Sequence, residues 1–493
     1  MAGKQMSRRQ FLALTATTGI GALLAACGGT STPPGGAAPT ASGGAAAPPT
    51  AAPAGGAAAP PTAAPAGGAA APTSEAPPAV STEENVIDWW NGWGGQGGKA
   101  LDEVAKAFNA ENHGFTVVRT TVPSVTEKLL TAIAGGVPPD VETGNVAYAE
   151  LYSRDAFQPL DDLIDSSKTF KRTDILDTSW NYSKWGGKTF GVPSVESFLR
   201  YALIVNVDLV KKAGLDPTKL PETWDEAFEW HKKMTEFDSA GNVKVVGLDP
   251  LDAMGGSWGG GDPSFWPIDY GFDYWDANSK TYNLDNPQFI AGLKVIKQFY
   301  DHIGAEKMTA FRKTSGTWTS DPTASFPAGV QGMIINGYWT PGELAKTAPD
   351  KNFAYGWVPV PAERKGKKIQ ATGGHNSGIP KGAKKADKAW QFIEFLTTDK
   401  AIDIIFNGVG WLGASKSYLD KVDTSKYKGL DWYVKSLKEA NDVRGMDVDP
   451  IEGFTGTEWT TDREKMTFGQ LTPEATAKQM QEALTKELKD RGI

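Results

Sequence analysis

Short apolar runs alternate with amphipathic stretches along the chain from residue 86 onward. Residues 86–90 (VIDWW) form an apolar run of strand length, and a glycine-rich turn follows it. In residues 99–112 (KALDEVAKAFNAEN), apolar side chains recur at the i, i+3, i+4 and i+7 spacing of an amphipathic helix. Residues 115–122 predict the next strand, 124–134 a helix opened by a Ser-x-x-Glu capping box, and 138–145 a further strand. This alternation favours a mostly parallel sheet covered by helices.

Similar signals recur in the later part of the chain. Residues 198–207 predict a strand, and a Thr-x-x-Glu capping box at 223–226 predicts the start of the next helix. An Asn-Pro pair predicts a helix over 287–302, and Thr472-Pro473-Glu474 predicts the start of a terminal helix. Residues 249–284 are rich in glycine, tryptophan and aspartate, which indicates a long loop and makes it a candidate functional segment.

The N-terminal residues have the features of an export signal. Arg8 and Arg9 precede an apolar stretch, residues 11–26, that is too short and too rich in small residues for a membrane span. We therefore interpret residues 1–26 as a signal peptide with twin-arginine character. The sequence LAAC ending at Cys27 resembles the lipobox of bacterial lipoproteins, which implies cleavage before Cys27 and lipidation of its thiol. The alternative is a free cysteine beside an ordinary cleavage site.

The segment that follows Cys27 has a low-complexity composition. Residues 28–85 consist almost entirely of glycine, alanine, proline, serine and threonine, and GGAAAPPTAAPA occurs at 43–54 and again at 55–66. Such a composition offers too little apolar surface to form a packed core. We expect residues 27–85 to be a lipidated cysteine followed by a disordered tether; a processed propeptide is the alternative.

Composition narrows the class of protein further. The body, residues 86–493, is long enough for two domains. The net charge of −8 and the absence of a basic block argue against nucleic-acid binding. Cys27 is the single cysteine, so the body has no thiol for a disulfide, a cysteine-liganded metal or nucleophilic catalysis. All 17 tryptophans lie in the body, which calls for a large core, a binding surface, or both.

The glycine-rich turn after the first strand matches a nucleotide-binding fingerprint only in part. Gly92, Gly94 and Gly97 have the spacing of a dinucleotide site, but no acidic residue ends the second strand to bind a ribose. We interpret the turn instead as a loop whose backbone N–H groups approach a polar ligand at the carboxyl edge of the sheet.

Catalytic and metal motifs are weak in this sequence. The four histidines are isolated and lack metal-ligand spacing. Several carboxylates could supply the pair that a glycosidase needs, although proximity cannot be read from the sequence: Glu196, Asp249, Asp252, Asp262 and Glu458. The same carboxylates would equally suit hydrogen bonds to sugar hydroxyls, so a carbohydrate-active hydrolase stays open as an alternative.

A series of motifs resembles, in order, the family-1 extracellular solute-binding proteins, the carbohydrate receptors of ABC importers. After the initial strand, glycine turn and helix come GGVPPDV, YALIVNVDLVKKAGL, GMIINGYW, YGWVPVP, SGIPKGAKKADKAWQFIEFL and GTEWTT. Two features depart from the family pattern: the tryptophan-rich loop at 249–275, which leaves the size of the sugar open, and Val207-Asp208 after Asn206.

The resemblance implies an α/β protein of the two-lobed periplasmic-binding type (type II) with its site in the cleft. By analogy, lobe 1 takes 86–193 and 375–425, and lobe 2 takes 194–374 and 426–493. The implied function is capture of a sugar or oligosaccharide and its delivery to an ABC permease, without catalysis or a cofactor, by a monomer lipid-anchored at the extracellular face of the membrane or in the periplasm. A hydrolase and a receptor for a non-sugar solute, such as a polyol phosphate or a peptide, are the alternatives.

Candidate ligand contacts follow from loop aromatics and from the resemblance. Tryptophans and a tyrosine in glycine-rich or polar loops are candidates for stacking on a sugar ring: Trp93, Trp258, Trp266, Tyr338, Trp339, Trp411 and Trp459. Among these, the resemblance assigns stacking positions to Tyr338 or Trp339 and to Trp459. It also points to Glu196 after the first crossover and to Asn91 and Asn145 at loop ends, while Gly373 and Gly374 indicate close backbone approach at the second crossover.

Overall fold

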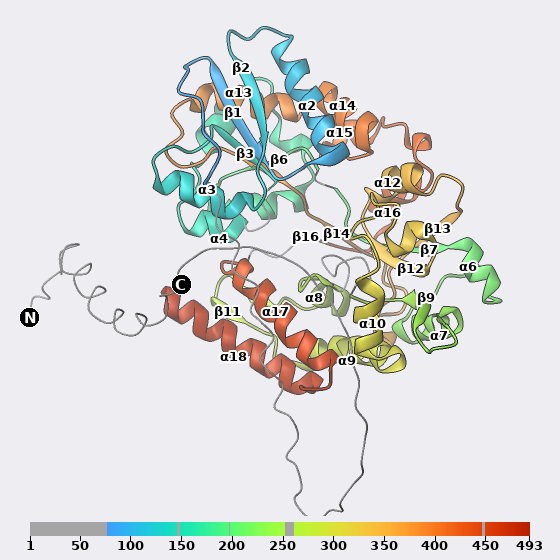
Figure 1. The fold of residues 1–493 in the computed structure, drawn as a ribbon. Coiled ribbons are helices and arrows are strands. Elements are labelled where there is room, and N and C mark those ends of the chain that lie inside the picture. Colours follow the sequence, from blue (N-terminus) through green and yellow to red (C-terminus); the bar gives the residue numbers. More distant parts are fainter. Residues whose placement is uncertain (1–75, 145–147, 197, 252–260, 446–448) are drawn as a thin grey trace, which may run out of the picture. The chain divides into compact units, whose positions relative to one another are not determined.

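The computed structural model describes residues 76–144, 148–196, 198–251, 261–445 and 449–493, which belong to one compact unit beginning at Ser74 (Figure 1). Cys27, most of the predicted tether, Asn145 and Trp258 lie outside the described residues. Two five-stranded sheets organise this unit, each with helices packed on it. Among the described residues, none of the helices is long and apolar enough to cross a membrane.

The first sheet has the strand order β2-β1-β3-β15-β6. Its bounds are β2 (Thr116–Thr121), β1 (Val86–Asn91), β3 (Val141–Thr143), β15 (Asn376–Gly378) and β6 (Val192–Pro193). β1 runs parallel to β2 and β3, as the alternating pattern predicts, but β15 runs antiparallel to both β3 and β6. β15 joins the sheet after the chain has passed through the second sheet and returned.

The second sheet has the order β13-β7-β12-β9-β8. It consists of β13 (Phe353–Gly356), β7 (Ala202–Asn206), β12 (Gln331–Asn336), β9 (Val243–Leu248) and β8 (Glu236–Phe237). β12 pairs in parallel with β9, whereas the other pairings are antiparallel. The prediction of a mostly parallel sheet is therefore wrong here, because periodicity identifies strands and does not fix their direction.

Helices of the first sheet contribute to the first hydrophobic core, which also includes Ile204 of β7 and Ile334 of β12. α2 (Gly95–Asn109) packs against α14 (Asp399–Val409), and α13 (Ala386–Leu396) contacts both. The predicted apolar face of α2 is confirmed, because Leu101 and Phe108 are fully buried. α3 (Val125–Ala134) forms as predicted, but its capping box does not: Ser124 has a left-handed backbone (φ 53°) and its side chain caps no N–H.

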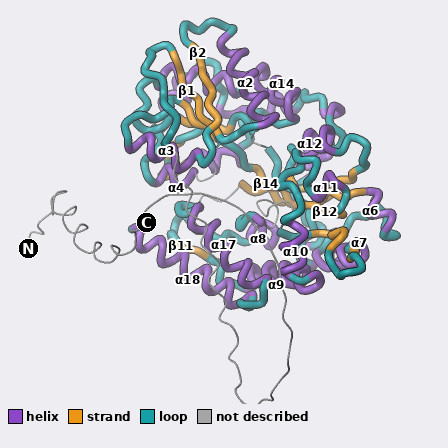
Figure 2. The backbone as a smooth tube through the Cα atoms, viewed as in Figure 1, coloured by secondary structure: helices purple, strands orange, loops and turns teal. Residues whose placement is uncertain are grey.

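The second sheet and its helices enclose a second core. α7 (Trp224–Met234), α9 (Pro287–Ile303), α17 (Glu452–Thr467) and α18 (Pro473–Arg491) are its long helices (Figure 2). Side chains at the predicted N-caps of α7, α9 and α18 accept backbone N–H hydrogen bonds. The sequence analysis placed Trp459 in a loop, which is wrong, because Trp459 lies in α17. α17 packs on α9 and α18, and this packing outweighs the low helix propensity of its two glycines.

The remaining α-helices and strands have at most ten residues. They are α4 (Tyr148–Ser153), α5 (Asp161–Ser166), α6 (Val207–Lys212), α8 (Phe265–Tyr270), α10 (Ala305–Arg312), α11 (Ser325–Ala328), α12 (Thr340–Thr347), α15 (Lys416–Leu419), α16 (Leu430–Glu439), β4 (Lys184–Trp185), β5 (Lys188–Thr189), β10 (Trp275–Asp276), β11 (Thr281–Tyr282), β14 (Ile369–Thr372) and β16 (Asp442–Gly445).

Two connecting segments run side by side where the chain passes from one sheet to the other. Segment 194–200, of which residue 197 lies outside the described residues, follows β6. Segment 371–375 begins in the last residues of β14 and precedes β15. The N–H of His375 donates to the carbonyl of Glu196 (2.7 Å), and the N–H of Arg200 donates to the carbonyl of Ala371 (3.0 Å). These hydrogen bonds bring side chains from distant parts of the sequence to one place, and the cavity described next lies there.

Candidate functional site

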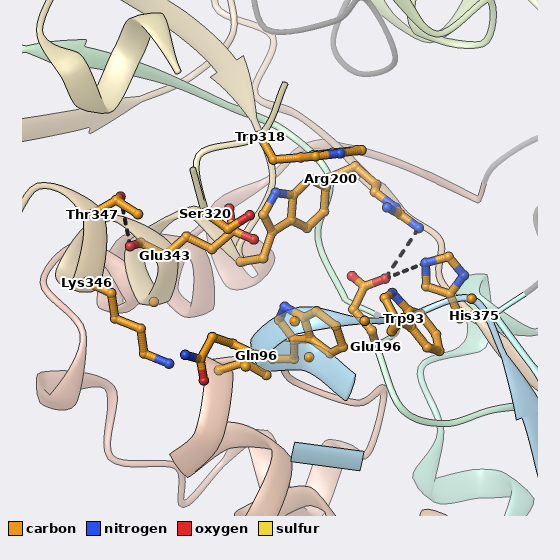
Figure 3. Close-up of a pocket in the computed structure, with 18 residues that line it drawn as sticks. Trp93, Gln96, Glu196, Arg200, Trp318, Ser320, Glu343, Lys346, Thr347 and His375 are labelled. Carbon is orange, nitrogen blue, oxygen red and sulfur yellow. Dashed lines mark hydrogen bonds and ion pairs between the residues drawn. The ribbon is translucent and has the colours of Figure 1, made fainter. Parts of the chain in front are cut away.

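A cavity of about 610 Å³ opens beside the two connecting segments. Its lining comes from the turn and first residues of α2, the connecting segments, the loop before α11, α12 and the end of α14: Gly92, Trp93, Gly94, Gly95, Gln96, Gly97, Glu196, Arg200, Trp318, Ser320, Trp339, Gly342, Glu343, Lys346, Thr347, His375, Val409 and Trp411. Elements from both sheets therefore contribute to one cavity, whose size is typical of small-molecule sites (Figure 3).

Four tryptophans supply much of the apolar surface of the cavity. Trp93 lies edge-on to the ring of His375 (centroids 4.7 Å apart) and is tilted against Trp411 (5.5 Å). The guanidinium carbon of Arg200 lies over the ring of Trp339, 5.4 Å from the ring centroid. Trp318 is 40% exposed, which leaves its indole accessible. Aromatic rings from several elements therefore lie around one space.

Glu196 forms the charged centre of the site. Its Oε2 lies 3.0 Å from Nε2 of His375 and 3.9 Å from Nη2 of Arg200, and Figure 3 shows the three side chains converging. The Glu196 and Arg200 side chains are only 6% and 4% exposed. Burial alone would raise the pKa of Glu196, but the Arg200 charge and the His375 hydrogen bond outweigh it and hold that pKa below its ordinary value. Glu196 is therefore a carboxylate at neutral pH.

The N-terminal turn of α2 gives the cavity a polar backbone edge. Gly94 is the N-cap and has no side chain to satisfy the first N–H groups of the helix, and residues 95–97 line the cavity. A Cβ at Gly97 would lie 2.5 Å from the ring of Trp411, so only glycine allows this close approach. The structure thus places the glycine-rich turn at the carboxyl end of β1, where the sequence analysis expected it.

Four of the side chains predicted to contact a ligand line the cavity, together with the predicted glycine turn: Trp93, Glu196, Trp339 and Trp411. Their assembly in one place agrees with the interpretation of loop aromatics and of the first crossover. Direct contact with a ligand stays a prediction for each of them.

The other described candidates do not line the cavity. The Oδ1 of buried Asn91 accepts a hydrogen bond from Arg119 (2.8 Å). The hydroxyl of buried Tyr338 donates to the carbonyl of Leu412 (3.0 Å) and also interacts with the Glu196 carboxylate. Gly373 belongs to the connecting segment with Gly374, and its N–H faces the carbonyl of Phe198 at 3.4 Å. These hydrogen bonds give the residues structural roles next to the cavity. Trp266 and Trp459 are buried in the second core.

Sequence reasoning missed several lining residues. Trp318 lies in a glycine-, serine- and threonine-rich stretch (TSGTWTSDPT), the same signal that identified the other loop tryptophans. Arg200, Glu343 and His375 carried no local signal. Their place in the site depends on pairing between distant segments, which a single sequence does not reveal.

Comparison with protein families gives a match over most of the body. The family described as bacterial extracellular solute-binding protein matches residues 91–403 of this chain. A binding protein of Brucella abortus (strain 2308) is 26% identical over 315 residues, covering 61% of this chain and 68% of the relative. The sn-glycerol-3-phosphate-binding periplasmic protein UgpB of Escherichia coli (strain K12) is 28% identical over 156 residues, 30% of this chain and 35% of that protein.

Solved structures with the same fold cover nearly the whole described body. CpMnBP1 with mannobiose bound has a TM-score of 0.73 at 24% identity, covering 82% of this chain and 100% of that one. The maltose/maltodextrin-binding domain MalE from Bdellovibrio bacteriovorus, bound to maltotriose, has a TM-score of 0.64 at 19% identity and covers 82% of this chain and 100% of that chain. At this level of identity the likeness establishes the fold, a two-lobed periplasmic-binding architecture of type II.

Proposed function

The chain belongs to the bacterial extracellular solute-binding proteins, and from this premise we propose that its solute is an uncharged saccharide held in the tryptophan-lined cavity. The protein would capture the sugar outside the cell and hand it to an ABC permease. The observation that carries this proposal is the grouping of Trp93, Trp318, Trp339 and Trp411 around the Glu196 centre.

A sugar ring matches the two kinds of surface in this cavity. One face of a pyranose carries C–H groups that pack on a flat aromatic ring, while its hydroxyls need hydrogen-bond donors and acceptors. The cavity offers tryptophans for the first and the side chains of Glu196, Gln96 and Ser320 for the second. The sugar-bound proteins of similar fold support this substrate class.

Charge pairing in the cavity favours a neutral solute over a phosphate. The cation Arg200 lies beside the carboxylate of Glu196, and the Lys346 ammonium donates to the carbonyl of Gly408. A phosphate site would gain most from cations directed at the ligand. The similarity to the glycerol-phosphate receptor UgpB keeps a polyol phosphate as the second candidate, and sn-glycerol-3-phosphate belongs in the same binding screen.

The first prediction tests the proposed substrate class. We expect a thermal-shift screen to find stabilisation by a mono- or oligosaccharide, since a ligand at 100 times its Kd adds about 2.7 kcal/mol. Trp93→Ala should then weaken binding of that sugar by about 1–3 kcal/mol, the scale of lost aromatic stacking. Titration calorimetry measures both affinities.

The screen also separates the alternatives. Stabilisation by sn-glycerol-3-phosphate with no response to sugars would contradict the saccharide proposal and favour the polyol phosphate. Release of reducing ends from an oligosaccharide by the purified protein would favour the hydrolase. An unchanged sugar affinity in Trp93→Ala would remove Trp93 from the site.

The placement of the protein at a membrane is a further part of the proposal. The lipobox-like LAAC sequence and the low-complexity segment support an anchor at Cys27 with a tether up to residue 85. The lipid would hold the receptor, as a monomer, at the outer face of the cell membrane or in the periplasm. The lobe assignment, 86–193 with 375–425 and 194–374 with 426–493, is supported by the two sheets, whose strands fall on either side of these boundaries.

The second prediction concerns this anchor. Cys27→Ser should move the protein from the membrane fraction to the soluble fraction or the medium, because the lipid would have no thiol to join. Fractionation and immunoblotting measure the change, and sugar affinity should stay as in the wild type. Full membrane retention of the variant would contradict lipidation at Cys27.

A further inference from the structure

Glu343 is a second carboxyl of the cavity, and it stands apart from the Glu196 centre. It lies in the first turn of α12, immediately after β12, and its partly accessible side chain lines the cavity (Figure 3). The hydroxyl of Thr319, from the loop before α11, donates to Oε2 of Glu343. The hydroxyl of Thr347 donates to the Glu343 carbonyl at 3.0 Å and to the Thr319 carbonyl at 2.8 Å, so two threonines fix this corner of the site.

The cations near Glu343 are directed to other acceptors. Arg200 and His375 lie against Glu196, and the Lys346 ammonium donates to the carbonyl of Gly408 on α14. Within the described part of the chain, Glu343 makes no ion pair. Its charged form therefore has one hydroxyl donor from Thr319, a second anion in Glu196 and a tryptophan-rich surrounding.

These surroundings disfavour the charged form. Burial raises the pKa of Glu343 to about 7; the Thr319 hydroxyl lowers it, the charge of Glu196 raises it, and Lys346 lowers it. Glu196 has a pKa below its ordinary value, because Arg200 and His375 face it. The cavity thus holds two carboxyls with opposite tendencies, one ionised and one able to carry a proton at neutral pH.

We propose that Glu343 contacts the bound solute as a protonated carboxyl that donates a hydrogen bond to a sugar oxygen, so that binding takes up a proton and weakens as pH rises above neutral. The inference rests on the proposed function and names a specificity residue of the same site. A solute that fills the cavity displaces the water that would solvate a Glu343 carboxylate. A sugar oxygen can accept a hydrogen bond from the protonated carboxyl of Glu343, while the Glu196 carboxylate accepts hydrogen bonds from sugar hydroxyls.

The direction and window of the pH effect follow from linkage. A ligand that binds the protonated form keeps its affinity below the pKa of the free protein and loses it above that value. With the Glu343 pKa at about 7, the Kd should rise about tenfold between pH 6 and pH 8. Proton uptake on binding should approach one proton at pH 8.

The third prediction compares the wild type with Glu343→Gln. Glutamine keeps the shape, an acceptor for Thr319 and a donor for the sugar, but it does not titrate in this range. We expect the variant to bind within about threefold of the wild type at pH 6 and to show a flat Kd to pH 8. Calorimetry with mannobiose and maltotriose, in buffers of different ionisation enthalpy, measures affinity and proton uptake together.

A matched control removes another helix-start carboxyl. Glu306→Gln replaces an exposed glutamate in the first turn of α10, and it should keep the wild-type pH dependence. A wild-type Kd that stays constant from pH 6 to pH 9, or a Glu343→Gln variant that keeps the tenfold change, would overturn the inference and leave the saccharide function intact.

A measurement without sugar separates failure of the inference from failure of the proposed function. Because folding raises the pKa of Glu343 to about 7, protonated Glu343 favours the folded state. This contribution to the free energy of unfolding is fully present below the ordinary pKa of a glutamate and is lost as the pH rises through about 7. Glu343→Gln should therefore gain melting temperature relative to the wild type from pH 5 to pH 8. Superimposable profiles would overturn the inference even if no saccharide bound, whereas the absence of sugar binding alone would overturn the function.

Discussion

Replacing Glu196 with alanine is expected to lower the free energy of unfolding by about 3–5 kcal/mol, the cost of removing one partner from a buried ion pair. The reason lies in what the substitution leaves behind. Arg200 is 4% exposed and would lose the carboxylate 3.9 Å from its Nη2, and His375 would lose the acceptor 3.0 Å from its Nε2. Urea unfolding, followed by tryptophan fluorescence, measures the change.

Two comparisons make this fourth prediction specific. Glu103→Ala removes the carboxylate of an exposed pair with Lys106 and should cost at most about 1 kcal/mol. The depressed pKa of Glu196 also sets the pH dependence: its contribution is present above the ordinary glutamate pKa and is lost as pH falls through the lower folded value. The wild-type advantage should thus shrink in acid, and equal losses for both variants at neutral pH would contradict a buried pair.

Much of the fold could be predicted from the sequence where local signals decide. The apolar spacing of α2 and the caps at Asn286 and Thr472 identify helices because the determinants lie within a few residues. Ser124 shows the limit of such signals, since the structure gives it a left-handed backbone that its capping-box sequence does not reveal. Strand direction could not be predicted either, because β15 and β7 take their neighbours from distant segments.

The candidate site shows the same difference between residues that carry a local sequence signal and residues that contacts between distant segments bring together. Trp93 and Trp411 could be predicted because an aromatic residue in a glycine-rich stretch is a local signal. Glu196 came from a resemblance between motifs. Arg200 and His375 could not be found, because backbone hydrogen bonds between segments 194–200 and 371–375 bring them to Glu196. Glu343 was missed for a related reason: its environment is built by Thr319, which comes from a separate loop.

The fifth prediction concerns Trp459, whose resemblance-based role and observed surroundings differ. The indole is 1% exposed, packs on Phe289 with ring centroids 6.0 Å apart, and donates from Nε1 to the carbonyl of Gly261 at 2.8 Å. The Arg463 guanidinium lies 5.6 Å from the ring centroid and donates to the same carbonyl. These contacts are those of a core residue, and Trp459 is not among the described residues that line the cavity.

Trp459→Ala is therefore expected to cost about 3–5 kcal/mol of unfolding free energy, as large-to-small substitutions of buried tryptophans do. The folded fraction should bind its sugar within about threefold of the wild type, because no lining side chain is removed. Trp93→Ala provides the matched contrast, with a larger loss of sugar affinity than of stability. Urea unfolding and calorimetry on both variants measure stability and sugar affinity. If Trp459→Ala loses sugar affinity while its unfolding midpoint stays near that of the wild type, Trp459 stacks on the ligand. The binding site would then extend beyond the cavity to Trp459.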